Sequence, residues 1–421
     1  MPSTCVGIFL LFLAPAARGS SWTLSQAVQR GVAVQAQVAA SKERASASQD
    51  LAKAAQASRL PQLSLRAGSI WSASRENQPL FVSANGRQET IGQLAITAPV
   101  IDAQLQALAQ AARDSAAAAQ IQIALTRLQT AASITNVWFQ LALAQEQTTL
   151  WQRTAGYDKR LFARTQEAFH AGALARIDVV QTELLLTQAR SQLALAKVQQ
   201  QTERRALNLQ LGLGVNANTT IRGNRPPSPA PSVSLSQLWQ QMQASQPLLR
   251  LAEKEIVVAR AEKAVQKAAY LPVLNAQLAY GIDNNGIPHR RDLGWQVGLG
   301  LSMPLFGFGR RQAQVAAADA NLGAVRADRE ALLLQMHARL NQDWGVYRRA
   351  QENARHAGKI ANDAEAVYRM TRKGFHAGAI NALNLAQAQN TWIQARLTDV
   401  QARLRVELAF KQLLLDTGQL P

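Results

Sequence analysis

The residues best suited to chemistry in this sequence are its five histidines, because neutral imidazole is the commonest metal ligand in proteins. His170 and His376 stand in two copies of the segment Phe-His-Ala-Gly-Ala, yet neither has a cysteine or a second histidine at ligand spacing beside it. Zinc sites are normally built from such neighbouring ligands. The pattern therefore favours polar turn residues, and we expect neither a metal nor a cofactor.

A run of glycines is the second candidate for chemistry, because glycine-rich loops bind phosphate groups. The run alternates within or just after a strand pattern and no Gly-Lys-Ser/Thr follows it, which favours small residues on one face of a strand; its members are Gly298, Gly300, Gly307 and Gly309. No nucleophile, base and orienting group form a recognisable set either. The sequence therefore predicts a protein that is not an enzyme.

Composition and charge narrow the class of protein only slightly. The chain has 421 residues, with 45 Lys and Arg against 27 Asp and Glu and a net charge of +18. Such an excess suits nucleic acid, an anionic membrane surface or mere solubility. A nucleic-acid-binding protein is one hypothesis, but the arginines are scattered along the whole chain and the N-terminal leader argues for export. We therefore expect no nucleic acid as a partner.

The first 20 residues have the character of a secretory signal peptide. An apolar run over residues 6–14 is followed by small residues up to Ser20, although no Lys or Arg precedes the run. A buried strand or a misplaced start is the alternative. Cys5, the only cysteine, would be removed with the leader, which excludes disulfide and thiolate chemistry from the mature chain. No later stretch approaches the roughly 18 apolar residues of a transmembrane helix, so a membrane crossing would have to use strands.

The rest of the chain is a tandem duplication. The segment at 169–173 recurs at 375–379, which is 206 residues later, and the segment at 98–101 matches 303–306 at nearly the same offset. A stretch rich in proline separates the copies and forbids a helix there. We predict the following domains: a signal peptide at 1–20, a first repeat at 21–214, a linker at 215–234 and a second repeat at 235–421.

Each repeat is predicted to hold a β-hairpin, because the period of its apolar residues changes to two. The pattern is clearest at 295–303, and weaker strands are expected at 63–71, 91–98 and 273–280, with loops near 77–85 and 283–291. Such two-faced strands suit a membrane with aromatic residues at its interface, but they equally suit a soluble sheet with one buried face. The positions that we assign to the membrane and its interface are Trp71, Tyr280, Trp295, Val297, Leu299 and Leu301.

Long helices are predicted around each hairpin. One helix is expected over 24–60, and uninterrupted helices of about 66 residues at 102–169 and 310–375 would each span roughly 100 Å. Their apolar residues step by three and four, which indicates antiparallel coiled coils. Each long helix is expected to end at its Phe-His-Ala-Gly-Ala turn, because glycine adopts the positive φ of a helix C-terminus. Return helices then run to about 211 and 415.

Several motifs in this order resemble the TolC-like outer-membrane efflux family: the duplicated plan, the Leu-Pro-x-Leu entry at 60–63, the Met-Pro-Leu-Phe-Gly-Phe-Gly-Arg-Arg-Gln exit at 303–312 and the glycine turns. One chain offers only four strands, so several chains would have to share one barrel. The resemblance implies a mainly α-helical protein with membrane β-strands. It would form a homotrimer with a periplasmic α-barrel and a shared twelve-stranded β-barrel in the outer membrane.

The resemblance also implies the exit duct of a tripartite export system. Such a duct passes drugs, toxic compounds or secreted polypeptides from an inner-membrane pump and a periplasmic adaptor to the outside. The alternative without a channel is a periplasmic coiled-coil adaptor or scaffold. Contact with the adaptor is expected at the tip turns, where small side chains allow helices to approach, although a tight turn alone would also need them: Ala171, Gly172, Ala173, Ala377, Gly378 and Ala379.

The tip constriction departs from the family pattern. Members with an acidic constriction carry two aspartates just past the second turn, and alignment on Gly378 places Asn384 and Gln387 there. A cation-selective ring would thus lack its carboxylates. Asp178 of the first repeat is retained and could tie closed helices together through Arg176 or a donor from another chain. It could equally be an aspartate that stabilises the positive end of its own helix.

Four arginines are candidates for contact with outer-membrane lipid. Arg290 and Arg291 lie in the second hairpin loop, and Arg310 and Arg311 open the long helix. If that loop faces outside, its guanidinium groups could pair with lipopolysaccharide phosphates. A solvated basic loop that limits aggregation is the alternative.

Overall fold

The computed structural model describes residues 21–71, 74–75, 78–79, 88–222, 234–284 and 293–420. The predicted signal peptide with Cys5, most of the linker, and the loop arginines Arg290 and Arg291 lie outside these residues. Among the helices of this described part, none combines the length and the apolarity that a membrane crossing needs.

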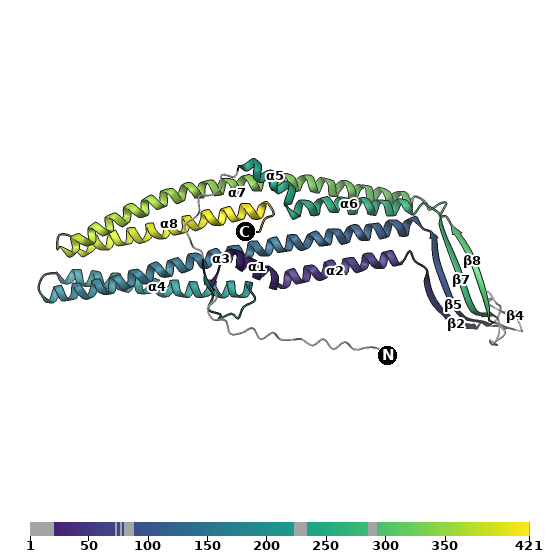
Figure 1. Ribbon diagram of the computed structural model, residues 1–421, viewed down its shortest axis with the longest axis horizontal. Coiled ribbons are helices and arrows are strands. Elements are labelled where there is room, and N and C mark those ends of the chain that lie inside the picture. Colours follow the sequence, from purple (N-terminus) through teal and green to yellow (C-terminus); the bar gives the residue numbers. More distant parts are fainter. Residues whose placement is uncertain are drawn as a thin grey trace. The chain divides into compact units, whose positions relative to one another are not determined.

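The chain divides into two compact units, and each is drawn from both predicted repeats. One unit contains the described residues up to Ala39 and those of Leu125–Gln246 and Gln335–Pro421. The other contains Ala40–Ala124 and Pro247–Leu334. The long helices α3 (Ala103–His170) and α7 (Arg310–His376) contribute residues to both units (Figure 1).

The second unit holds a four-stranded antiparallel sheet in the order β2-β5-β7-β8. Its strands are β2 (Gln62–Trp71), β5 (Gln88–Ile101), β7 (Val273–Asn284) and β8 (Gly294–Ser302). The two predicted hairpins are confirmed, because β2 pairs with β5 and β7 with β8. Pairing of β5 with β7 joins them. Since β7 continues to residue 284, the loop predicted from residue 283 starts later than expected.

Two short strand pairs were not predicted. A parallel pair in the first unit joins β1 (Ser21–Trp22) to β6 (Thr220–Ile221) and so connects the start of the described chain to the stretch that follows the first repeat. Beyond β2, the strands β3 (Ser74–Arg75) and β4 (Gln78–Pro79) pair antiparallel.

The prediction of one helix over 24–60 is wrong, because the chain breaks at Gln35 between α1 (Leu24–Val34) and α2 (Ala36–Ala57). The second repeat breaks in the same way at Gln246, between α5 (Leu235–Ser245) and α6 (Pro247–Ala268). Both glutamines have extended backbone, with ψ of 127° and 118°.

A hydrogen bond to a distant helix explains both breaks. The Gln35 amide donates to the carbonyl of Gln210 at the end of α4 (Arg176–Gln210), at 2.9 Å. The Gln246 amide donates to the carbonyl of Asp416 at the end of α8 (Ala382–Asp416), at 2.7 Å. The last carbonyls of a helix have no partner within it, so each break caps a return helix of its own repeat.

The first helix of each repeat starts with the same capping box. The Thr23 hydroxyl accepts from the backbone N–H of Gln26, whose side chain accepts in return from the Thr23 N–H. Ser234 and Gln237 form the same reciprocal pair at the start of α5. Such a box satisfies two N–H groups that the helix leaves free.

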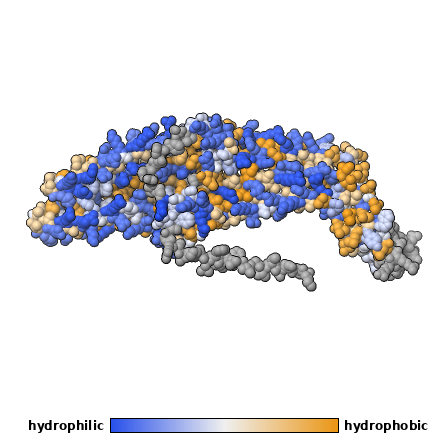
Figure 2. Space-filling view, viewed as in Figure 1, coloured by the Kyte–Doolittle hydropathy of each residue, from blue (hydrophilic) through white to orange (hydrophobic). Residues whose placement is uncertain are grey.

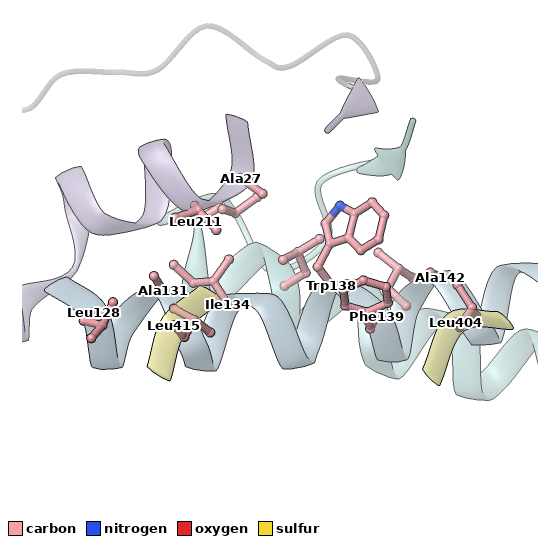
Figure 3. Close-up of a cluster of buried hydrophobic side chains, with 13 residues drawn as sticks. Ala27, Leu128, Ala131, Ile134, Trp138, Phe139, Ala142, Leu211, Leu404 and Leu415 are labelled. Carbon is pink, nitrogen blue, oxygen red and sulfur yellow. The ribbon is translucent and has the colours of Figure 1, made fainter. Parts of the chain in front are cut away.

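The core of the first unit lies where α1, α3, α4 and α8 meet around Trp138 and Phe139 (Figure 3). The rings of these two residues contact edge to face, with 5.0 Å between their centroids. Gly31 of α1 allows close approach to α3, because a Cβ at this position would lie only 2.2 Å from Cδ1 of Ile134. Any side chain there would have to displace the fully buried Ile134.

The long helices run uninterrupted, as predicted, and end in matching turns. Gly172 and Gly378 adopt φ of 75° and 73°. At each turn the glycine N–H donates back three residues and the following N–H donates back five, from Ala173 to Ala168 and from Ala379 to Gly374. These bonds form a Schellman motif, which satisfies the last carbonyls of α3 and α7. The predicted glycine turns are confirmed.

Candidate functional site

The sheet presents one continuous apolar face. Directly paired residues in an antiparallel sheet point to the same side, and Leu65, Leu94, Tyr280 and Trp295 form one such row across the four strands. A second row contains Leu63, Ile96, Leu278 and Val297. Figure 2 shows hydrophobic residues gathered over this sheet.

The opposite face of the sheet carries polar and small residues. Its rows include Arg66 beside Gln93, and Gln62 beside Thr97, Gln277 and Gly298. The separation into two chemically different faces is clear in the rows nearest the helices, whereas toward the hairpin loops Ile70 lies on the polar face and Ser69 and Thr90 on the apolar face. A sheet with an apolar surface this open in the single chain needs another apolar phase or further protein to cover it.

The strand residues that the sequence assigned to the membrane all lie on the apolar face. Trp71 is the last residue of β2, and Tyr280 is directly paired with Trp295 near the start of β8, so the three aromatic residues stand toward the hairpin-loop end. Val297, Leu299 and Leu301 continue the face along β8 and are exposed in the single chain.

The tip residues named from sequence lie at the two Schellman turns. Ala171, Gly172 and Ala173 are all exposed, as are their counterparts Ala377, Gly378 and Ala379. Adding a Cβ at Gly172 or Gly378 would meet no atom within 4 Å, so positive φ and not crowding accounts for the glycine. The turns therefore present an open surface of small side chains.

Asp178 joins the two repeats. Its carboxylate is buried, and Oδ1 accepts a hydrogen bond from the backbone N–H of Ala382, the first residue of α8, at 3.1 Å. The donor is thus a main-chain group of the second repeat in the same chain and not the Arg176 guanidinium that the sequence suggested. A carboxylate at a helix N-terminus interacts favourably with the helix dipole. Asp178 lies in the first turn of its own helix α4, and its hydrogen bond is to the start of α8.

A second connection between the repeats, which sequence analysis missed, lies deeper in the tip. We call Asp158, Tyr368 and Gln389 the tip latch. The Gln389 amide donates to both carboxylate oxygens of Asp158, each at 2.9 Å, and its carbonyl accepts from the Tyr368 hydroxyl at 3.3 Å. Asp158 and Gln389 are almost fully buried. The latch joins α3 of the first repeat to α7 and α8 of the second.

Burial of the latch changes its acid–base chemistry. Burial raises the pKa of the Asp158 carboxyl to about 6, and the hydrogen bond from Gln389 opposes the rise. Burial likewise raises the pKa of the Tyr368 hydroxyl. Aromatic packing surrounds the latch, because Trp392 stacks on the Tyr368 ring with 5.0 Å between centroids and the Arg372 guanidinium lies 5.8 Å from the same ring.

No local sequence signal could have found the latch. An aspartate in the middle of a long helix reads as a solvated acid, and its two partners lie more than 200 residues further along. Asn384 and Gln387, the residues that replace the expected aspartates, are both exposed on α8. The N–H of Asn384 donates to the side chain of Asn381, which caps the helix, at 3.0 Å.

The histidines of the turns show no metal-site geometry. Within the part of the chain that the structure describes, no group of three or more His, Cys, Asp or Glu side chains lies close enough to hold a metal ion. Burial and the nearby Arg164 and Arg372 lower the pKa of His376.

A sheet with one apolar face, joined to paired helical hairpins that end in small-residue turns, defines a class of envelope channel proteins. Comparisons with known proteins give the family. The model of the outer membrane efflux protein family matches residues 25–213 and 238–419, which covers most of both repeats. The chain therefore belongs to the outer membrane efflux protein family.

The similar proteins agree with this assignment. The cobalt-zinc-cadmium resistance protein CzcC of Cupriavidus metallidurans is 24% identical over 284 residues, and the match spans 66% of this chain and 65% of that protein. The structure is similar to the Campylobacter jejuni CmeC outer membrane channel, with a TM-score of 0.80, 14% identity and coverage of 94% of this chain and 85% of that one. It is equally similar to the CusC channel, with a TM-score of 0.81, 14% identity and 96% coverage of both chains.

These findings place the chain in a family of channels and transporters rather than enzymes. By family it is an outer membrane efflux protein. The match to CzcC spans slightly less than two thirds of that protein's length.

Proposed function

We propose that three copies of this chain close their sheets into one barrel and so form the exit duct. The observation that supports this most directly is the open sheet, in which β2 and β8 are edge strands and one face is mostly apolar. Unpaired backbone groups are not tolerated in hydrocarbon, so β8 of one chain must pair with β2 of the next. Three four-stranded sheets then give twelve strands, within the range of membrane barrels.

Single-channel recording tests the duct. Detergent-purified protein, with its oligomeric mass measured first, is added to a planar bilayer. A trimer that gives discrete conductance steps supports the proposal. A monomer that stays in solution without detergent and gives no conductance contradicts it and supports the adaptor or scaffold instead.

We further propose that the two exposed turns are the contact with the adaptor. Their small side chains would let adaptor helices approach closely, so a bulky residue should interfere. Ala173→Trp and Ala379→Trp are expected to abolish export in cells while leaving the trimer and its bilayer conductance intact. Gln314→Trp, at an exposed position four residues into α7, is the matched control. Export that survives the tip substitutions would remove the turns from the contact.

For the exported cargo we propose divalent transition-metal cations. Support comes from the sequence match to a cobalt-zinc-cadmium resistance protein. Deletion of the gene should increase sensitivity to zinc, cobalt and cadmium, and the intact gene should restore resistance. Unchanged metal sensitivity, together with sensitivity to drugs or loss of a secreted polypeptide, would reassign the cargo without affecting the duct.

A further inference from the structure

The return helix of the second repeat ends at a charged group where that of the first ends at a neutral one. At the break between α1 and α2, the Gln35 amide donates to the side-chain oxygen of Gln210 at 3.0 Å as well as to its carbonyl. At the offset of 206 residues, Gln210 corresponds to Asp416, the last residue of α8. The same point of the fold therefore has an amide in one repeat and a carboxylate in the other.

The end of α8 is bound from two sides. On one side, the Gln246 amide of the α5–α6 break donates to the carbonyl of Asp416 at 2.7 Å. The Ser245 hydroxyl donates to the carbonyl of the next residue, Thr417, at 2.6 Å. On the other side, the Arg339 guanidinium of α7 lies 3.2 Å from Oδ1 of Asp416. The Asp416 side chain thus connects the end of α8 to α7.

Arg339 contacts two carboxylates. Its Nε also lies 3.6 Å from Oδ2 of Asp343, one turn further along α7, and the two carboxyl groups are within hydrogen-bonding reach of each other. Asp416 is only 5% exposed, and its Oδ2 is buried with no hydrogen-bond donor among the described residues. Two ionised carboxylates cannot donate to each other, and one guanidinium offsets only one of their charges. One proton between Asp343 and Asp416 would supply the missing donor and the missing charge. We call Arg339, Asp343 and Asp416 the acid junction.

The surroundings of Asp416 favour its protonated form. Burial and the contact with Asp343 raise the pKa of the Asp416 carboxyl to about 7, whereas the Arg339 charge and a hydrogen bond from Gln412 oppose the rise. The charged groups that face Asp416 come from α7, since its neighbour Gln412 is neutral and α5, described in full, has no charged residue. Because the folded pKa exceeds the usual 3.8, the stabilising contribution is complete below pH 3.8 and is lost as pH rises through about 7.

A cavity gives water a path to the acid junction. It has a volume of about 440 Å³ and lies among α3, α7 and α8, with Asp343, Arg405 and Gln412 in its lining. A cavity of this size has room for several water molecules. The proton can therefore exchange with solvent while the helices stay folded.

We propose that Asp343 and Asp416 share one proton, and that loss of this proton releases the end of α8 from α7. When the pair holds its proton, a hydrogen bond joins the two carboxyl groups. When the proton is lost at alkaline pH, two negative charges compete for the single Arg339 guanidinium. The second repeat thus has a pH-sensitive junction, whereas the amide junction of the first repeat does not respond to pH. The inference is independent of the proposed duct, because all its groups belong to one chain.

Nitroxide mobility at the end of α8 tests the acid junction. In a chain whose Cys5 is replaced by serine, Gln419→Cys places a label on an exposed residue just after α8. Gly214→Cys places the control label just after α4, at an exposed position where an added Cβ meets no atom within 4 Å. The detergent-purified protein is titrated from pH 5 to pH 9. We expect the label at residue 419 to become more mobile with a midpoint near pH 7, and the label at residue 214 to keep its mobility.

Substitutions assign the change to the acid junction. Asp416→Asn should keep the label at residue 419 restricted over the whole pH range, because its neutral amide can donate to Asp343 at every pH. Asp343→Asn should move the midpoint to below about pH 5, because it removes the like charge and supplies a donor. Asp363→Asn, at an exposed acid on α7, should leave the midpoint where it is.

Each other outcome overturns the inference. If the mobility at residue 419 is constant from pH 5 to pH 9, or rises equally in Asp416→Asn, the acid junction does not hold the helix end. An equal rise at residue 214 would mean that the protein loosens as a whole. A midpoint that stays near pH 7 in Asp343→Asn would contradict the shared proton, and this variant decides the matter if Asp416→Asn does not fold. Bilayer conductance of the trimer tests the duct separately.

Discussion

The two tip turns have the same backbone, but the helices that follow them start in different ways. At the offset of 206 residues, Ala175 corresponds to Asn381 and Asp178 to Asn384. In the second repeat Asn381 caps its own helix α8. In the first repeat Ala175 provides no side-chain cap for α4, and Asp178 accepts its hydrogen bond from α8 instead. Two side chains therefore accept hydrogen bonds from backbone N–H groups at the start of α8: Asp178 from Ala382, and Asn381 from Asn384.

This difference shows that the repeats have become complementary rather than self-sufficient. The tip latch shows the same complementarity, because Asp158 belongs to the first repeat while Tyr368 and Gln389 belong to the second. The position equivalent to Asp158 in the second repeat is Ala364, which has no polar side chain. Separation of the two helical hairpins at the tip therefore requires breaking bonds between repeats.

Removing the centre of the latch should have the largest effect. Gln389→Leu leaves the buried Asp158 carboxylate and the Tyr368 hydroxyl without the amide that joins them. We expect the free energy of unfolding at pH 7 to fall by about 2–3 kcal/mol, because a buried charged group loses its partner. The measurement is thermal unfolding of the trimer in detergent. Gln387→Leu, at an exposed position on the same helix, should change it by less than about 0.5 kcal/mol.

The buried Asp158 carboxyl of the tip latch should make the free energy of unfolding depend on pH. The pKa of Asp158 is raised from 3.8 to about 6 in the folded state, so the folded protein binds this proton more tightly than the unfolded chain. The resulting stability is fully present below pH 3.8, declines as pH rises and is absent above about pH 6. The loss should amount to about 2–3 kcal/mol.

Substitutions identify the group responsible. Asp158→Asn should reduce the difference in unfolding midpoint between pH 4 and pH 8, whereas Asp363→Asn, an exposed acid on α7, should leave it unchanged. A difference should remain in Asp158→Asn, because burial also raises the pKa of Asp416, to about 7. A pH dependence that Asp158→Asn leaves undiminished would show that Asp158 does not contribute to it.

Local patterns predicted much of the fold, while long-range polar contacts escaped sequence analysis. The strands followed from a period of two, and the Schellman turns followed from the glycine at the end of each long helix. The Gln35 break did not, because its capping partner Gln210 lies 175 residues away. The capping boxes of Thr23 and Ser234 were legible in sequence as a Ser/Thr followed three residues later by Gln, but that signal marks only where a helix starts. Asp178 was named from sequence, yet its hydrogen-bond partner Ala382 could be found only in three dimensions.

The connections between strand and long helix offer another comparison of the repeats, at a smaller scale. Among the described residues, only the connection of the second repeat contains a non-glycine residue with positive φ, which is Phe308. Phe308→Gly should relieve this strain and raise stability in detergent by about 1–2 kcal/mol. Gly309→Ala, at φ of 80°, should lower stability by about 1 kcal/mol. If Phe308→Gly is destabilising in detergent, the ring makes protein contacts that the single chain does not show.

The smallest predicted losses of stability come from substitutions at the starts of α4 and α8, and they distinguish how these two helices begin. Asp178→Ala removes the acceptor for the Ala382 N–H and should cost about 1 kcal/mol, and Asn381→Ala should cost a similar amount because it removes the cap of α8. Asn384→Ala, at the position equivalent to Asp178, should be nearly neutral because its side chain is exposed. Because the bonds of Asp178 and Asn381 serve one helix terminus, the double variant should lose more than the two single losses combined. Strict additivity would instead mean that α8 keeps its first turn without either side chain.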